Sequence, residues 1–136
     1  MEIILVSLQG GKTIFAFLLE SQIRELENDI MKHTQLRLGD NNYDSLADKS
    51  KFAADLYRWY DEEYRPQVIT NDIINPIFEK PGDLTIEAKK KLEVLSEVSL
   101  RTFGKIENPK ELGFEPKLIQ DIIDMANRIS SFFRSN

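Results

Sequence analysis

One short stretch near the start of the chain has residues that could bind phosphate. Gly10 to Thr13 reads Gly-Gly-Lys-Thr and follows the apolar run Ile4 to Leu8. A phosphate-binding loop ends in Gly-Lys-Ser/Thr, has an earlier glycine five positions before that ending, and lies between a strand and a helix. Val6 occupies the position of the earlier glycine, and valine disfavours the positive φ angles such a loop uses. We therefore keep nucleotide or phosphate binding by Gly10 to Thr13 as the second hypothesis for function.

The only histidine of the chain offers a second possible chemistry. His33 follows Asp29 by four residues, so both side chains would share one face of a helix and could hold one side of a metal ion. A carboxylate-bridged metal pair in a helical bundle needs Glu-x-x-His twice, which one histidine cannot supply. No Ser-x-x-Lys or Gly-x-Ser-x-Gly pattern provides a nucleophile. The sequence thus predicts no catalytic residue, no metal and no cofactor, and a structural role for His33.

The densest group of aromatic and acidic residues is the stretch LYRWYDEEY, Leu56 to Tyr64. Phe52 and Trp59 are seven residues apart and align on a helix, about 100° round from the apolar stripe through Leu56 and Tyr60. One interpretation is an exposed aromatic patch with an acidic rim, which would bind a basic protein. The other is that a neighbouring helix, or the segment Val68 to Phe78, covers both rings. The predicted partner-binding residues are Phe52, Asp55, Trp59, Glu62 and Glu63.

Apolar residues recur at three- and four-residue steps through most of the chain, which is typical of amphipathic helices. The predicted helices cover residues 21–32, 45–64, 85–103 and the final stretch from Pro116. Thr85 suits the N-cap of the third helix, Gly104 its end, and Pro116 the first position of the last. Val68 to Phe78 is predicted as a short helix or an extended segment, interrupted at Asn75-Pro76.

The start of the chain fits two structures. In one, Gly10-Gly11 is the turn of a β-hairpin that pairs Ile3 to Leu8 with Thr13 to Leu18. In the other, Thr13 caps a long helix that reaches His33 and has apolar residues at positions 15, 19, 23, 26 and 30. The predicted fold is mainly α: a single domain over residues 1–136, a bundle of four to five helices with an N-terminal strand or hairpin, or an α+β arrangement as the alternative.

The amino-acid composition argues against some classes of function. The chain has 136 residues, 41% of them hydrophobic, no cysteine and a formal charge of −5. An acidic domain repels nucleic-acid phosphate, and no apolar run approaches the ~20 residues of a membrane-spanning helix. We expect a cytoplasmic, non-enzymatic interaction protein, either an adaptor or an inhibitor resembling small acidic immunity proteins in size and charge. The expected partner is a protein with a basic surface, and the apolar N-terminus would also suit a homodimer.

Overall fold

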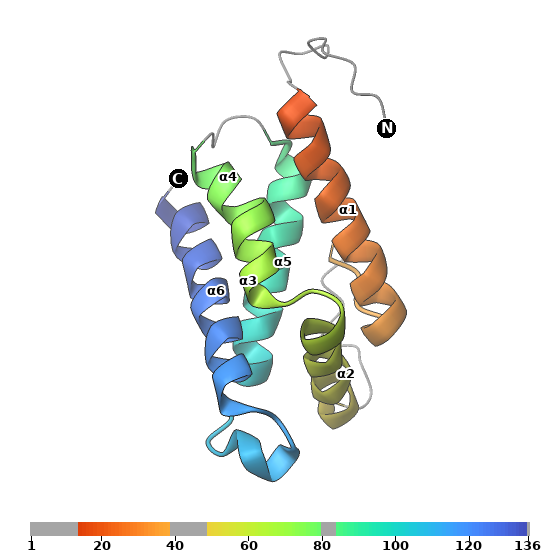
Figure 1. The fold of residues 1–136 in the computed structure, drawn as a ribbon, viewed down its shortest axis with the longest axis vertical. Coiled ribbons are helices and arrows are strands. Elements are labelled where there is room, and N and C mark those ends of the chain that lie inside the picture. The colour runs from red at the N-terminus through yellow and green to blue at the C-terminus, as the bar shows by residue number, and fades with distance from the viewer. Residues whose placement is uncertain (1–13, 39–48, 80–83, 136) are drawn as a thin grey trace.

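The computed structural model describes residues 14–38, 49–79 and 84–135 of the chain. These residues form helices and no strand, which confirms the prediction of a mainly α fold. The elements are α1 (Ile14–Thr34), α2 (Lys49–Glu62), α3 (Pro66–Ile69), the π-helix η3 (Thr70–Ile74), α4 (Asn75–Glu79), α5 (Ile86–Phe103), the 3-10 helix η4 (Pro109–Leu112) and α6 (Pro116–Ser135). In Figure 1, the segment from α3 to α4 stands between α1 and α6, in front of α5. None of the described helices is long and apolar enough to cross a membrane.

The first helix decides between the two structures predicted for the start of the chain. Because α1 begins at Ile14, residues 14–18 are helical, and a hairpin that uses them as its second strand is wrong. The long-helix alternative is confirmed from Ile14 to Thr34. Its buried apolar side chains have helical spacing and are Leu19, Ile23, Leu26 and Ile30. Residues 1–13, with the expected Thr13 cap and the Gly10 to Thr13 loop, lie outside the described residues.

The middle of the helix predicted for residues 45–64 is confirmed, but its C-terminal end differs. Residues 45–48, the start of the predicted helix, lie outside the described part of the chain, and α2 ends at Glu62 rather than Tyr64. Arg65 adopts an extended conformation with ψ 144°, because the residue before a proline avoids the helical region. Pro66 then opens α3, where its fixed φ suits a first helical position.

The segment from α3 to α4 is one continuous helix that contains a π-helical turn. The helical alternative for this segment is confirmed, but the interruption predicted at Asn75-Pro76 is wrong. In a regular α-helix, the Pro76 ring would clash with the carbonyl group of Asp72, four residues earlier. The wider turn η3 ends just before this proline, and the Asn75 N–H bonds to the carbonyl of Thr70, five residues back. A π turn of this kind lets the chain remain helical past the proline.

Local signals in the sequence set the ends of α5 and α6 as predicted. The Thr85 hydroxyl oxygen accepts a hydrogen bond from the Ala88 N–H at 3.1 Å, as an N-cap should. The same hydroxyl donates to the Glu20 carboxylate at 2.7 Å, so it also ties α5 to α1. Gly113 has a φ of 78°, which glycine adopts without strain, and it turns the chain from η4 toward Pro116.

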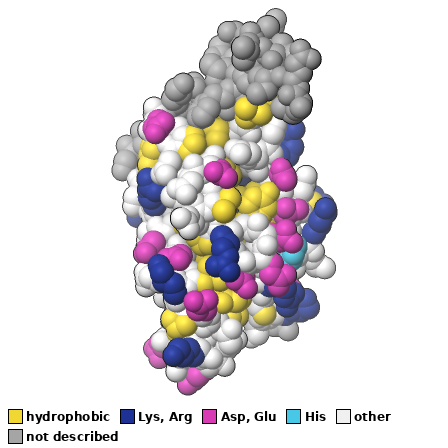
Figure 2. Space-filling view, in the orientation of Figure 1, with side chains coloured by type: hydrophobic (Ala, Val, Ile, Leu, Met, Phe, Trp, Pro, Cys, Tyr) yellow, Lys and Arg dark blue, Asp and Glu magenta, His cyan; other side chains and the backbone are white. Residues whose placement is uncertain are grey.

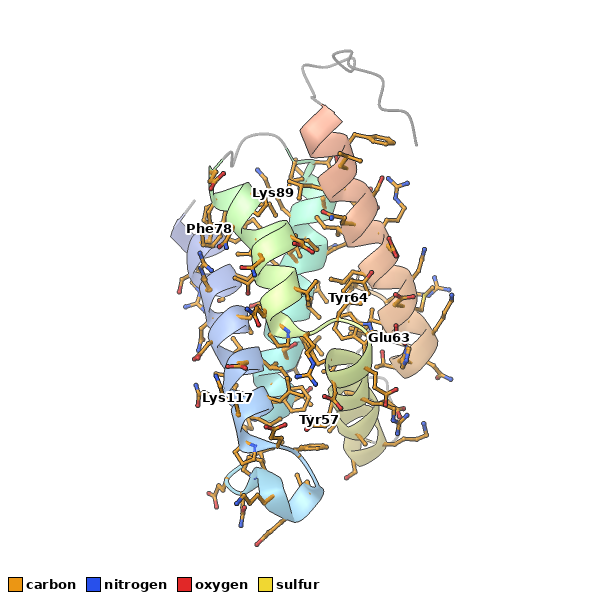
Figure 3. All side chains as sticks on the ribbon, in the orientation of Figure 1. Tyr57, Glu63, Tyr64, Phe78, Lys89 and Lys117 are labelled. Carbon is orange, nitrogen blue, oxygen red and sulfur yellow. The ribbon has the colours of Figure 1, made fainter. Side chains whose placement is uncertain are left out.

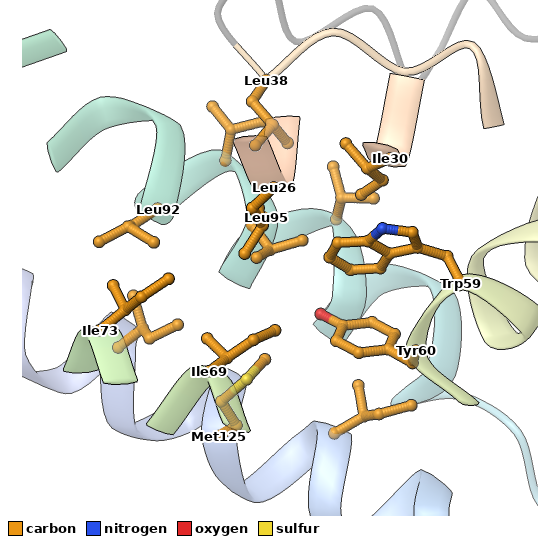
Figure 4. Close-up of a cluster of buried hydrophobic side chains, with 14 of the residues drawn as sticks. Leu26, Ile30, Leu38, Trp59, Tyr60, Ile69, Ile73, Leu92, Leu95 and Met125 are labelled. Atoms are coloured by element: carbon orange, nitrogen blue, oxygen red, sulfur yellow. The ribbon is translucent and has the colours of Figure 1, made fainter. Parts of the chain in front are cut away.

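The buried side chains form one continuous cluster to which all of the longer helices contribute. Figure 4 shows Trp59 and Tyr60 of α2 inside this cluster, together with Ile30 of α1 and Leu95 of α5. The Tyr60 hydroxyl lies 2.7 Å from the Ser99 hydroxyl, and both groups are buried. Burial raises the pKa of Tyr60 far above its ordinary value, so the phenol stays neutral and hydrogen-bonded within the core. This buried pair fixes α2 against α5.

Candidate functional site

Phe52 and Trp59, the aromatic residues of the predicted patch, lie in the core. Their side chains are 3% and 0% exposed. The Trp59 ring packs edge-on against Tyr60 with centroids 4.8 Å apart, and its centroid lies 5.4 Å from that of Tyr64. Of the two interpretations, the exposed aromatic patch is therefore wrong, and the alternative, in which neighbouring parts of the chain cover both rings, is confirmed.

The apolar stripe predicted for α2 differs from the face that the structure buries. The predicted stripe runs through Leu46, Ala53, Leu56, Tyr57, Tyr60 and Tyr64. The buried apolar side chains of α2 are Phe52, Leu56, Trp59 and Tyr60, whereas Ala53, Tyr57 and Tyr64 are only partly buried. Helix α1 packs against α2, and Tyr60 of α2 bonds to Ser99 of α5, so α2 buries a face toward α1 as well as one toward α5. An arc of apolar residues this wide fits several orientations, and only the neighbouring helices choose between them.

The three acidic residues predicted to surround the patch have different surroundings. Asp55 is 8% exposed, and its carboxylate is paired with Lys51 at 2.8 Å and with Arg58 at 3.5 Å. These two cations already neutralise Asp55, so it has little charge to offer a basic partner. Glu62 and Glu63 are both exposed at the end of α2. Of the three carboxylates, only these two are accessible to a partner.

Glu63 belongs to a group of acidic and aromatic residues that we call the acidic face. Its members are Glu25, Asp29 and His33 of α1, and Glu63 and Tyr64 of the link after α2. The Glu63 carboxylate lies 3.9 Å from Nε2 of His33, and Figure 3 shows Glu63 and Tyr64 beside α1. In the space-filling view of Figure 2, acidic side chains lie above and below the histidine on the α1 side of the molecule, and lysine and arginine side chains flank this group.

Tyr64 lies among the carboxylates of the acidic face. Its pKa is raised to about 12, first because the half-buried hydroxyl is desolvated and then because Glu25, Asp29 and Glu63 are negatively charged nearby. A hydrogen bond to the Asp29 carboxylate raises the pKa further. Three carboxylates from two segments of the chain therefore act on a single hydroxyl group, and the local potential is negative.

In the part of the chain that the structure describes, no lysine or arginine forms an ion pair with these three carboxylates. Within the described residues, Glu25 and Asp29 form no ion pair, and the basic side chain within 4 Å of the Glu63 carboxylate is the imidazole of His33. Several other carboxylates of the chain are paired with a lysine or arginine. These are Glu27, Asp55, Asp61, Glu87, Glu97 and Asp121. The acidic face therefore keeps most of its charge.

The sequence predicted Glu63 as a partner-binding residue, but it did not predict that Glu25, Asp29 and His33 of α1 lie beside it. Glu25, Asp29 and His33 are spaced by four residues, which is a signal that they share one face of a helix. Glu25 was interpreted as part of a solvated surface, because the sequence does not indicate that Tyr64 and Glu63 lie against it. The contact joins positions thirty or more residues apart, and only the packing of α1 on α2 produces it.

The contacts of His33 are those of a structural residue. Nδ1 of His33 donates a hydrogen bond to the backbone carbonyl of Asp29 at 3.0 Å, one turn earlier in α1. The described residues contain no group of three or more histidine and carboxylate side chains placed to hold a metal ion. His33 therefore packs at the end of α1, with its second nitrogen directed toward Glu63.

Two grooves flank α6, and neither is lined by the tyrosines of α2. One, of about 450 Å³, lies between α3 and α6 and includes Gln67, Thr70, Asp124 and Arg128. The other, of about 510 Å³, lies between α5 and α6. The tyrosines of α2 have structural contacts instead: Tyr57, for example, accepts a hydrogen bond from the backbone N–H of Glu115 at 2.9 Å.

Comparison with known proteins adds no family to this description. No protein family, no curated protein and no solved structure is significantly similar to the chain. The nucleotide-binding hypothesis concerns Gly10 to Thr13, which lie outside the described residues, so it stays a prediction.

Proposed function

We propose that this chain is a non-enzymatic, cytoplasmic interaction protein that binds a basic protein partner through the acidic face. The observations that support the proposal are that Glu25, Asp29 and Glu63 lie near Tyr64 and that, among the described residues, none of these carboxylates forms an ion pair with a lysine or arginine. A negative surface of this kind attracts a positive one and accelerates encounter. Self-association, the other expectation for the chain, stays a prediction.

The acidic face also offers the rigidity and aromatic content that interfaces use. Tyr64 packs on the buried Trp59 ring at 5.4 Å, so its position is fixed by the core. Tyrosine is enriched at protein interfaces, because it contributes both apolar area and a hydrogen-bonding group. A partner that docks here would meet a Tyr64 ring that is already held in place, and little free energy would be lost in ordering it.

The test is to neutralise the acidic face and measure binding of a purified partner. The double variant Glu25→Gln/Glu63→Gln removes two negative charges from exposed positions. Proteins retained by the immobilised chain from an extract of the source cells would be identified, purified and titrated by calorimetry. We expect a basic partner whose Kd rises roughly tenfold in the variant, since each exposed charge contributes about 0.5–1 kcal/mol. Binding should also weaken between 50 and 500 mM salt.

A matched control is available at the far end of the molecule. Glu107 and Glu111 are exposed and form no ion pair among the described residues, so Glu107→Gln/Glu111→Gln changes the net charge equally. The control should change the Kd by less than twofold. A partner that binds both double variants with the same loss of affinity, or one with an acidic surface, would contradict the proposal.

A further inference from the structure

We propose that the groove between α3 and α6 binds a free amino acid, a small molecule with one ammonium group and one carboxylate group. The site is separate from the acidic face and goes beyond the proposed function. In Figure 3, Lys117 marks the α6 side of the molecule, and Glu63 lies across from it beside α1.

The groove has a wall on each side and a buried apolar lining. Its volume is about 450 Å³, which is within the range of small-molecule sites. Pro66 and Met125, the two apolar residues that line it, are both buried. The polar side chains that line it belong to Gln67 of α3, Thr70 of η3, and Lys117, Asp121, Asp124 and Arg128 of α6.

Arg128 is held by an aromatic ring rather than by a carboxylate. Its guanidinium carbon lies 4.8 Å from the centroid of the Phe78 ring, and Phe78 stacks on Phe132 with centroids 4.3 Å apart. A guanidinium group that lies over a ring keeps the N–H donors in its own plane available for hydrogen bonds. Because Arg128 forms no ion pair among the described residues, its charge is available to the carboxylate of a ligand.

Asp124 supplies the opposite charge one helical turn earlier. Its carboxylate accepts a hydrogen bond from the Gln120 amide at 2.9 Å and forms no ion pair within the described ranges. The other carboxylate of the groove, Asp121, is paired with Lys117 at 2.7 Å. Positions four apart on a helix have Cβ atoms about 5–6 Å apart, so one small molecule can reach both Asp124 and Arg128.

The wall opposite α6 adds hydrogen-bonding groups and an unusual backbone. The Gln67 amide and the Thr70 hydroxyl form no side-chain hydrogen bond with another described residue. Each of these groups both donates and accepts, so either end of an amino acid could bond to them. Thr70 also begins the π-helix η3, and π turns are rare and often found at functional sites.

The two charges of α6 favour an amino acid over a simple ion. An anion at Arg128 would be repelled by Asp124, and a cation at Asp124 would be repelled by Arg128. A molecule with both charges meets an opposite charge at each end. Its ammonium group would bond to Asp124 and its carboxylate to Arg128.

The experiment titrates the isotope-labelled full chain with each of the common protein amino acids, at up to about 10 mM, and follows the backbone amide resonances by NMR. We expect at least one amino acid to shift the resonances of Thr70 and Arg128 to saturation, with those of Asp29 unchanged. The methyl ester and the N-acetyl derivative of that amino acid each lack one charge. Both should bind about tenfold more weakly, which corresponds to the loss of one charge-assisted hydrogen bond.

Variants of the chain test the same contacts from the side of the protein. Arg128→Gln and Asp124→Asn should each raise the Kd of the amino acid about tenfold. Arg134→Gln is the matched control, because Arg134 is also an exposed arginine of α6 but does not line this groove. The control should change the Kd by less than about twofold.

Three results would overturn the inference. The first is that no amino acid gives a saturable shift of the groove resonances. The second is that the ester or the N-acetyl derivative binds as tightly as the parent amino acid, because the two charges would then not be recognised together. The third is that Arg134→Gln weakens binding as much as Arg128→Gln does. None of these results bears on the acidic face, so the proposed function is tested independently.

Discussion

Truncation of Trp59 is the sharpest test of how α2 is oriented. An exposed tryptophan at an interface could be replaced by alanine with the fold intact and only partner binding lost. In the structure the Trp59 side chain is 0% exposed and packs against Tyr60 and Tyr64. Trp59→Ala should therefore leave a cavity in the core and destabilise the whole protein.

The expected loss of stability follows from the burial of this side chain. Replacing a fully buried aromatic residue with alanine costs about 3–5 kcal/mol. The loss should lie near the lower end, because the buried Trp59 indole N–H has no hydrogen-bond partner among the described residues and its removal relieves that penalty. We expect a loss of about 3 kcal/mol out of a typical total of 5–15 kcal/mol. Trp59→Phe keeps most of the ring and removes the N–H, so it should cost about 1 kcal/mol.

Thermal unfolding followed by circular dichroism at the helical band would measure these losses. Fluorescence is unsuitable, because Trp59 is the only tryptophan of the chain. For a chain of this size, 3 kcal/mol corresponds to a fall in Tm of roughly 12 °C. Phe17→Ala is the control, since Phe17 is 52% exposed and its truncation should lower the Tm by less than about 3 °C. If Trp59→Ala unfolds within 3 °C of the unaltered chain, the orientation of α2 described above is refuted.

Two further predictions concern buried and half-buried tyrosines. The Tyr60–Ser99 hydrogen bond predicts a non-additive double-mutant cycle: Tyr60→Phe and Ser99→Ala should each cost about 1–2 kcal/mol in urea unfolding, and the double variant no more than the worse single one. Additive losses would show that the two hydroxyl groups are not coupled. Because the folded-state pKa of Tyr64 is raised from 10.0 to about 12, its stabilising contribution is complete below pH 10 and is lost as pH rises toward 12. Tyr64→Phe should reduce the fall in Tm over this range and remove one late-titrating phenol from the absorbance at 295 nm, and an unchanged titration would contradict the assignment.

The sequence by itself determined the class of fold and many of the helix ends. Apolar spacing identified the helical segments, and single residues with specific backbone chemistry fixed their limits: Thr85 as an N-cap, Gly113 with its positive φ, and Pro116 at a first helical position. These signals act over a few neighbouring residues, because they depend on local hydrogen bonds and allowed dihedral angles. They can therefore be recognised without knowing what else lies nearby.

Only the tertiary structure decided which faces of the helices are covered. The stripe of α2 alone left Trp59 either exposed or covered by a neighbouring helix, and only the packing of the helices shows that it is buried. The acidic face has the same origin, since Glu25 and Tyr64 meet only when α1 packs against the end of α2. Helical periodicity places residues on a common face, but the neighbour of that face is set by contacts between distant parts of the chain, which minimise the apolar area left in water.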